Sequence, residues 1–234
     1  GSGIGGVHID AGGMGGMDDS PDFIDVHASS QDDEIALGAS ISVDGGGVQQ
    51  IGGSHAFLGE EGGVNGETGS QALGDMIIVD NLSPDENQSP RVTISGVKAV
   101  DDLLTISAGE GSDTLEVPTG LTNVMRVSYM GHHGSSDSGS DTLIYTAGGD
   151  VTVDVTGDFL DDHATGGISP DISVHGVDDV MLNADGHDVD IVGDADDDFV
   201  EVTPTGPDSV DATRDGRVTT WHMGAVGVFD VHLG

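Results

Sequence analysis

The chain contains no cysteine and almost no lysine or arginine, and these absences exclude several classes of protein. Without cysteine, neither a disulfide bond nor a thiolate metal site can hold the fold. The five basic residues, among 234 residues in total, form no cluster. Because contacts to phosphate groups need clusters of Lys and Arg, the sequence argues against nucleic acid as a partner. Anionic membrane surfaces are disfavoured for the same reason.

Long apolar runs and helix-forming stretches are also missing. No run of about 20 apolar residues is present, so the sequence predicts no membrane-spanning helix. The 40 Gly residues interrupt nearly every window in which an amphipathic helix would form. Aromatic residues make up only 3% of the chain, whereas Val and Ile are frequent. Layers of small β-branched side chains suit this composition, which predicts an all-β protein.

Known catalytic motifs are absent as well. The chain has no G-x-S-x-G nucleophile elbow, P-loop, H-E-x-x-H zinc motif or dinucleotide fingerprint. Adjacent carboxylates carry almost no information about an acid and base pair in a chain with so many Asp residues. We therefore predict that the protein is not an enzyme. A carbohydrate-active enzyme or carbohydrate-binding module on a β-helix scaffold is the alternative.

What the chain does have is a large excess of acid. Asp and Glu total 43 residues, of which 35 are Asp, and the formal net charge is −38 at pH 7. Asp favours turns and strand ends and supplies oxygen to hard cations, whereas Glu favours helices. Such a charge repels itself unless concentrated salt or bound cations offset it. The composition therefore predicts a halophilic protein with acidic, cation-binding faces.

One short pattern recurs along the chain: Asp, any residue, an aliphatic residue, any residue, then Val, Leu or Tyr. Copies begin at Asp22, Asp33, Asp75, Asp113, Asp141 and Asp198. Each copy reads as a turn followed by a short strand with one face inward. Recurring units of this kind predict a parallel β-solenoid (β-helix) of about ten coils, with about 20 to 25 residues in each. A Greek-key β-sandwich or jelly roll is the alternative fold, because the long loops permit it.

We expect residues 1–234 to form a single β-repeat domain with a weak internal boundary near residues 81–90. Sequons at Asn81 and Asn87 lie in that segment and favour an extracellular or cell-surface location. The last residues, from Val228 to Gly234, look like a repeat unit cut short. The chain is therefore expected to be one segment of a longer array or filament, in which exposed end strands join neighbouring copies.

Two segments share a motif with a known family. Residues 108–116, Ala-Gly-Glu-Gly-Ser-Asp-Thr-Leu-Glu, resemble one copy of the haemolysin-type (RTX-like) calcium-binding nonapeptide GGxGxDxUx without its first Gly. Residues 138–143, Ser-Gly-Ser-Asp-Thr-Leu, are similar. Residues 193–206 resemble a unit of Asp/Gly-rich extracellular tandem-repeat proteins. In the calcium-binding family each ion is shared between successive turns of a parallel β-roll, so the resemblance implies bound Ca²⁺.

A Ca²⁺ site needs six to eight oxygen ligands, usually from several carboxylates and backbone carbonyls. The resemblance and the clustering of Asp together predict metal ligands at Gly109, Gly111, Asp113, Asp137, Asp141, Asp194, Asp196, Asp197 and Asp198. In the competing interpretation, these Asp residues cap turns and hydrate the surface.

These features together predict a structural extracellular or surface protein of a halophile: a filament, sheath or adhesin subunit. Its expected partner is a further copy of itself, in a polymer or surface array, and a glycan is the alternative partner. Neither a nucleic acid partner nor a membrane span is expected. A viral spike or capsid protein is a further alternative function.

Overall fold

The computed structural model is an all-β protein. It describes residues 7–10, 22–28, 32–43, 47–51, 76–81, 92–97, 102–121, 125–131, 139–154, 159–162, 172–193, 200–214 and 219–232. Within these residues the chain forms nineteen β-strands in two sheets. No helix long and apolar enough to cross a membrane occurs in this part of the chain.

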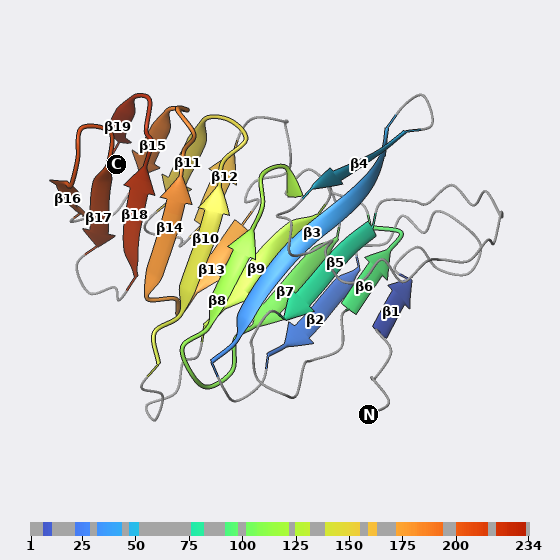
Figure 1. The fold of residues 1–234 in the computed structure, drawn as a ribbon. Coiled ribbons are helices and arrows are strands. Elements are labelled where there is room, and N and C mark those ends of the chain that lie inside the picture. Colours follow the sequence, from blue (N-terminus) through green and yellow to red (C-terminus); the bar gives the residue numbers. More distant parts are fainter. Residues whose placement is uncertain are drawn as a thin grey trace.

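The strands form one sheet of eleven and one of eight, which face each other as two layers in Figure 1. The eleven-stranded sheet has the order β1 (Val7–Asp10), β6 (Val92–Ser95), β5 (Met76–Asn81), β3 (Glu34–Val43), β8 (Thr114–Val117), β10 (Thr142–Thr146), β14 (Asp179–Asn183), β18 (Thr220–Gly224), β17 (Val210–Arg214) and β16 (Val200–Pro204), with β4 (Gly47–Ile51) paired to β3. The eight-stranded sheet has the order β19 (Phe229–His232), β15 (Val189–Val192), β11 (Val151–Asp154), β12 (Phe159–Asp162), β13 (Ile172–His175), β9 (Arg126–Met130), β7 (Leu103–Ser107) and β2 (Phe23–His27).

The chain passes back and forth between the two sheets. Strands β7 and β9 belong to the eight-stranded sheet, whereas β8 and β10, which follow them in the chain, belong to the eleven-stranded sheet. Each pass places a strand parallel to the strand of an earlier pass, in a register that aligns Leu115, Leu143, Val180 and Trp221 across β8, β10, β14 and β18. Parallel neighbours need a crossover connection, and here the crossover runs through the opposite sheet.

The core lies between the facing sheets and is built from alternate strand positions. In β7, Leu104 and Ile106 are buried and Thr105 between them is partly exposed. The parallel register repeats this layer, because Leu104 lies beside Val127 of β9, and Val127 lies beside Ile172 of β13. Burial of one aliphatic side chain of this size contributes about 1.5–3 kcal/mol. Thin layers of aliphatic residues therefore make up most of the core, together with the buried rings of Tyr129, Tyr145 and Trp221.

Antiparallel strands flank the parallel part of the eleven-stranded sheet. At one end β5 is antiparallel to β3 and to β6, and at the other end β17 is antiparallel to β16 and to β18. In the eight-stranded sheet, β12 lies antiparallel between β11 and β13. The recurring sequence pattern does not predict these antiparallel pairings. The pattern reflects parallel contacts between successive passes of the chain, whereas the antiparallel pairs join strands that are close in the sequence.

The prediction of an all-β protein is confirmed, and the sheets are mostly parallel. This pairing differs from that of a Greek-key sandwich or jelly roll, whose sheets are antiparallel.

The expected weak boundary near residues 81–90 lies between β5 and β6. These two strands pair directly, with Met76 opposite Ser95, so the chain on one side of the segment is hydrogen-bonded to the chain on the other.

A substitution at Gly139 tests whether successive passes of the chain stack closely, because a Cβ atom at this position would overlap the carbonyl oxygen of Gly111. We expect Gly139→Ala to lower the free energy of unfolding by about 1–3 kcal/mol, as overpacking against backbone does. Gly224→Ala is the matched control, since nothing lies within 4 Å of its Cβ position, and we expect a change within about 0.5 kcal/mol. Urea unfolding of both variants measures the difference. Equal effects at the two positions would contradict this stacking.

Candidate functional site

A column of aspartates lines the corner at which the chain enters the eleven-stranded sheet. Asp33, Asp113 and Asp141 immediately precede β3, β8 and β10, which are parallel neighbours. Asp178 precedes β14, the next strand of the same sheet. Because the strands are in register, the four residues before them are stacked one above another. We call Asp33, Asp113, Asp141 and Asp178 the aspartate column.

Three carboxylates of the column, those of Asp113, Asp141 and Asp178, each accept a hydrogen bond from the backbone N–H of the preceding aspartate in the stack. The Asp33 N–H donates to Asp113 Oδ1 at 2.7 Å. In the same way, Asp113 N–H donates to Asp141 Oδ1 at 3.0 Å and Asp141 N–H to Asp178 Oδ2 at 2.9 Å. These amides lie just before the strands, so the carboxylates satisfy donors at the strand starts. The column is thus one capping interaction repeated from strand to strand.

Ionisation of Asp113, inside the column, is hindered. This residue is 0% exposed, between Asp33 at 5% and Asp141 at 2%. Burial raises the pKa of Asp113 to about 7; the hydrogen bond from the Asp33 backbone opposes this rise, and repulsion by Asp141, Asp33 and Asp32 adds to it. Its second oxygen, Oδ2, is buried without a hydrogen-bond partner. The carboxyl group of Asp113 therefore still has the capacity to bind a proton, a water molecule or a cation.

Tyr129, on β9 of the opposite sheet, is buried near the column. Its side chain is 0% exposed, and its hydroxyl group has no hydrogen-bond partner. Burial, together with the negative charges of Asp141, Asp113 and Asp33, raises the pKa of Tyr129 well above its ordinary value. The hydroxyl group therefore stays protonated. Buried polar atoms without partners are costly, so Tyr129 and Asp113 together mark this corner as a candidate binding site.

Four of the nine predicted metal ligands lie in the described residues, and the fold brings them together. Gly109 and Gly111 form the bend between β7 and β8, with φ angles of 100° and 120° that favour glycine. Asp113 and Asp141 are neighbours in the column. The other five predicted ligands lie outside the described residues: Asp137, Asp194, Asp196, Asp197 and Asp198.

The two segments that share the nonapeptide motif lie side by side although 28 residues separate them in the chain. Ser140 N–H donates to Ser112 Oγ at 3.1 Å, and Leu143 lies beside Leu115. The Asp carboxylates in these segments cap backbone amides, which is the role that competes with calcium binding in the sequence interpretation. Calcium binding at these residues stays a prediction.

Sequence reasoning missed Tyr129 and Asp178 as parts of this site. Tyr129 carries a detectable signal, because it alternates with Val127 along β9 and is thereby placed on the inward face. Asp178 also carries a detectable signal, because residues 178–182, Asp-Asp-Val-Met-Leu, fit the recurring pattern. Which inward tyrosine faces which carboxylate depends on how the two sheets lie against each other, and sequence spacing does not contain that information.

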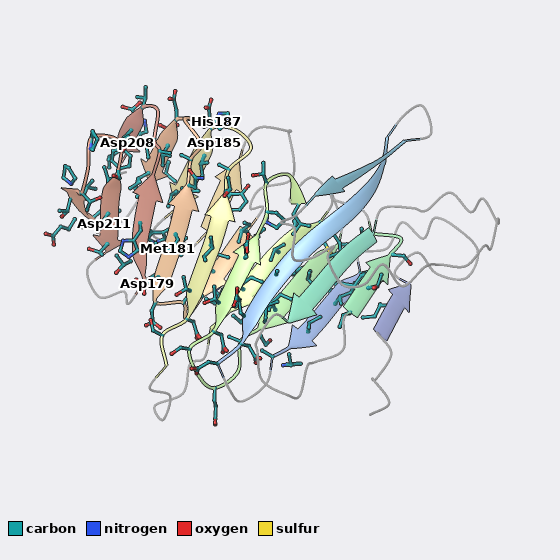
Figure 2. All side chains as sticks on the ribbon, in the orientation of Figure 1. Asp179, Met181, Asp185, His187, Asp208 and Asp211 are labelled. Carbon is teal, nitrogen blue, oxygen red and sulfur yellow. The ribbon has the colours of Figure 1, made fainter. Side chains whose placement is uncertain are left out.

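A second candidate site is an open groove on the outer face of the eleven-stranded sheet, with a volume of about 360 Å³. The side chains of Ile144 and Met181, which are 39% and 45% exposed, contribute apolar surface. Thr205 and Ser209, from the segment between β16 and β17, also line it. Figure 2 shows Met181 on this face, with Asp179 lower on the same strand. The groove thus combines an exposed apolar surface with polar groups.

His222 on β18 lies at this groove and links three strands. Its Nδ1 lies 2.9 Å from Asp211 Oδ1 on β17, and its Nε2 lies 3.1 Å from Asp179 Oδ1 on β14. Burial lowers the pKa of His222, but the hydrogen bonds and charges of Asp211 and Asp179 outweigh burial and raise the pKa above its ordinary value. Because carboxylates only accept, an imidazole bonded to two of them is protonated at both nitrogens. In this arrangement His222 links β18 to β17 and β14, and it has no free nitrogen to act as a base.

Comparisons of the chain with protein-family models, with curated proteins and with solved structures gave no match.

The raised pKa of Asp113 predicts a pH dependence of stability without added metal. The folded protein keeps a proton on Asp113 that the unfolded chain releases near pH 4, so the stability of the wild type falls as pH rises from about 4 to about 7. This loss is at most about 4 kcal/mol. Asp113→Asn keeps an acceptor for the Asp33 N–H and carries no charge, so its stability should fall less over the same range.

Urea unfolding in a chelator, at several pH values, measures this difference. Glu116→Gln is the matched control, because Glu116 lies on the same strand and is exposed; we expect its pH profile to follow that of the wild type. Parallel profiles for Asp113→Asn and the wild type would show that Asp113 ionises normally in the folded protein.

Proposed function

We propose that the chain is a structural subunit of an extracellular or cell-surface assembly of a halophile, folded as a parallel β-solenoid. Support comes from interactions that recur from one pass of the chain to the next. The aspartate column repeats one hydrogen bond between successive strands, and Gly139 stacks on Gly111 in the bends. Stacked units that each contact only their neighbours are the mark of repeat architectures.

One observation carries this proposal: apolar side chains are exposed at both ends of the eight-stranded sheet. Within the described residues, β2 and β19 are its end strands and each pairs on one side only. Phe23 of β2 is 74% exposed, Val231 of β19 is 41% exposed, and Val228, just before β19, is 53% exposed. An unpaired strand edge with apolar side chains is a template for pairing with another chain. Two different end surfaces give head-to-tail contacts, which can extend into a filament.

The net charge sets the conditions under which such contacts form. Two copies that each carry a formal charge of −38 repel each other strongly in dilute buffer. In salt of about 1 M the screening length falls to about 3 Å, so only the contact surfaces themselves still interact electrostatically. Concentrated salt should therefore permit the apolar ends to meet, as a protein of a halophile requires.

Assembly through these ends is tested by light scattering and negative-stain microscopy at low salt and at about 2 M NaCl. We expect the wild type to form particles well above the 23.6 kDa monomer in concentrated salt. Phe23→Asp and Val231→Asp should remain monomeric there, because each adds a charge to an apolar end. Met181→Asp is the control, since Met181 is also exposed but lies on the outer face of the sheet. A wild type that stays monomeric at both salt concentrations, or a Met181→Asp variant that fails equally, would contradict the proposal.

We also propose that the aspartate column binds Ca²⁺ next to Asp113. The support is Asp113 Oδ2, which is buried without a hydrogen-bond partner among the described residues and is a carboxylate oxygen of the kind that Ca²⁺ prefers. The neighbouring charges of Asp33 and Asp141, which oppose ionisation of Asp113, would favour a bound cation. A cation bound to Asp113 Oδ2 would satisfy that oxygen and offset the repulsion within the column.

Calcium binding should reverse the order of stability between the wild type and Asp113→Asn. With a chelator at pH 8, we expect the uncharged variant to be the more stable protein. With Ca²⁺ at about 1,000 times its dissociation constant, the wild type should gain about 4.1 kcal/mol and Asp113→Asn little. Thermal unfolding in both buffers, with Glu116→Gln as control, measures the reversal. Equal gains in the wild type and Asp113→Asn would place calcium elsewhere.

The groove favours a carbohydrate-binding module as the second candidate function. Asn183, Thr205, Ser209 and Asp211 line it, and such groups form hydrogen bonds with sugar hydroxyls. The sole tryptophan, Trp221, is only 1% exposed and offers no ring surface for a sugar. The groove therefore supports this function less strongly than the exposed ends of the eight-stranded sheet support assembly.

A further inference from the structure

We propose that Asp190, Asp230 and His232 form a binding site for one divalent transition-metal ion at the β19 edge of the eight-stranded sheet. This site is separate from the aspartate column and from the predicted calcium ligands. Its three side chains come from two adjacent strands, β15 and β19, and offer one imidazole nitrogen and two carboxylates.

Strand register places the three groups on one face. In the parallel pair β15 and β19, Asp190 lies beside Asp230, and Val192 lies beside His232. Val189 and Ile191 of β15 are buried, so Asp190 between them points to the outer face of the sheet. Asp230 and His232 are two residues apart on β19 and share that face with Asp190. The ligand set is therefore fixed by backbone pairing and not by a loop conformation.

The distances suit a shared ion better than direct contact. One ligand atom from each residue can be chosen so that all three lie within 4.8 Å of one another. His232 Nε2 lies 4.0 Å from Asp190 Oδ1, which is too long for a hydrogen bond. Tetrahedral ligands at about 2.0–2.2 Å from a zinc ion are about 3.3–3.6 Å apart, so a small side-chain rotation brings the two atoms to this separation. A metal ion would lie between these two atoms without a change in the backbone.

Electrostatics also favours a cation at this place. Asp190 and Asp230 lie directly side by side on neighbouring strands, and like charges in that arrangement are destabilising. A divalent ion would turn this repulsion into attraction and would link the edge strand β19 to β15. The imidazole in the set selects zinc, nickel, copper or iron over calcium, which prefers an all-oxygen site. Three protein ligands leave the remaining coordination positions to water.

The chain contains a natural comparison for this site at the other end of the same sheet. Strand β2 carries the same triplet, Asp25-Val26-His27, that β19 carries as residues 230–232. Beside Asp25, however, β7 has Thr105, so no second carboxylate is present. His27 Nε2 contacts Asp25 Oδ2 directly at 3.2 Å. The triplet on β2 is thus an ordinary ion pair, and the carboxylate of Asp190 is what distinguishes the β19 site.

Calorimetric titration with Zn²⁺ tests the proposal on the full chain, in about 1 M NaCl with excess CaCl₂ to mask the many weaker acidic sites. We expect one tight Zn²⁺ per wild-type chain. His232→Ala and Asp190→Asn should each weaken this phase by about tenfold or more, whereas His27→Ala should bind as the wild type does. Circular dichroism confirms that each variant is folded. Because Asp190 and His232 are tested separately, a variant that fails to fold leaves the other to decide.

Hydrogen exchange gives a second readout that does not depend on the heat of binding. Zn²⁺ should slow the exchange of the β19 amides in the wild type and in His27→Ala, and leave them unchanged in His232→Ala. The proposal is overturned by the absence of a tight phase in the wild type, by an equal loss in His27→Ala, or by full binding in both His232→Ala and Asp190→Asn.

Discussion

The starts of the parallel strands β3, β8 and β10 in the eleven-stranded sheet are fixed by one repeated hydrogen bond, from a backbone N–H to the aspartate carboxylate of the next strand. The same device occurs at other corners, where the Asp22 N–H donates to Asp102 Oδ1 at 3.0 Å and the Val228 N–H donates to Asp188 Oδ1 at 2.8 Å. A slip of one residue would turn every inward side chain outward. The carboxylate bonds therefore hold the register on which the whole layered core depends.

The repeated hydrogen bonds to aspartate carboxylates have an electrostatic cost, and this cost depends on the ionic medium around the protein. Stacked carboxylates repel one another, and the raised pKa of Asp113 shows how large the repulsion and burial are at the centre of the column. A proton, a bound cation or concentrated salt each offsets that cost. In the proposed assembly the same offset would act between molecules, because the apolar ends of the eight-stranded sheet would meet only where the surface charge is screened. Stability and assembly are thus expected to respond together to the ionic medium.

Much of this architecture could be predicted from the sequence, and particular residues show where prediction ends. The pattern that begins at Asp33, Asp113 and Asp141 correctly marked three parallel neighbours, because each copy encodes a turn and an inward-facing strand. The antiparallel strands β12 and β17 could not be found in this way, since they lack the pattern, and the copy at Asp75 marks β5 as a strand without indicating its antiparallel pairing. The Asp190 and His232 cluster was also missed, because register between strands about 40 residues apart decides which side chains meet, and single-strand alternation does not contain that register.

Hydrogen exchange at the backbone amides of Asp33, Asp113 and Asp141 tests the central interaction most directly. These amides precede their strands and, without the carboxylate bonds, would exchange as turn amides do. With the bonds in place, we expect protection close to that of the core strand amides, such as those of Leu115 and Leu143, because only extensive unfolding would then expose them. Exchange at the rate of unprotected turn amides at all three positions would contradict the account.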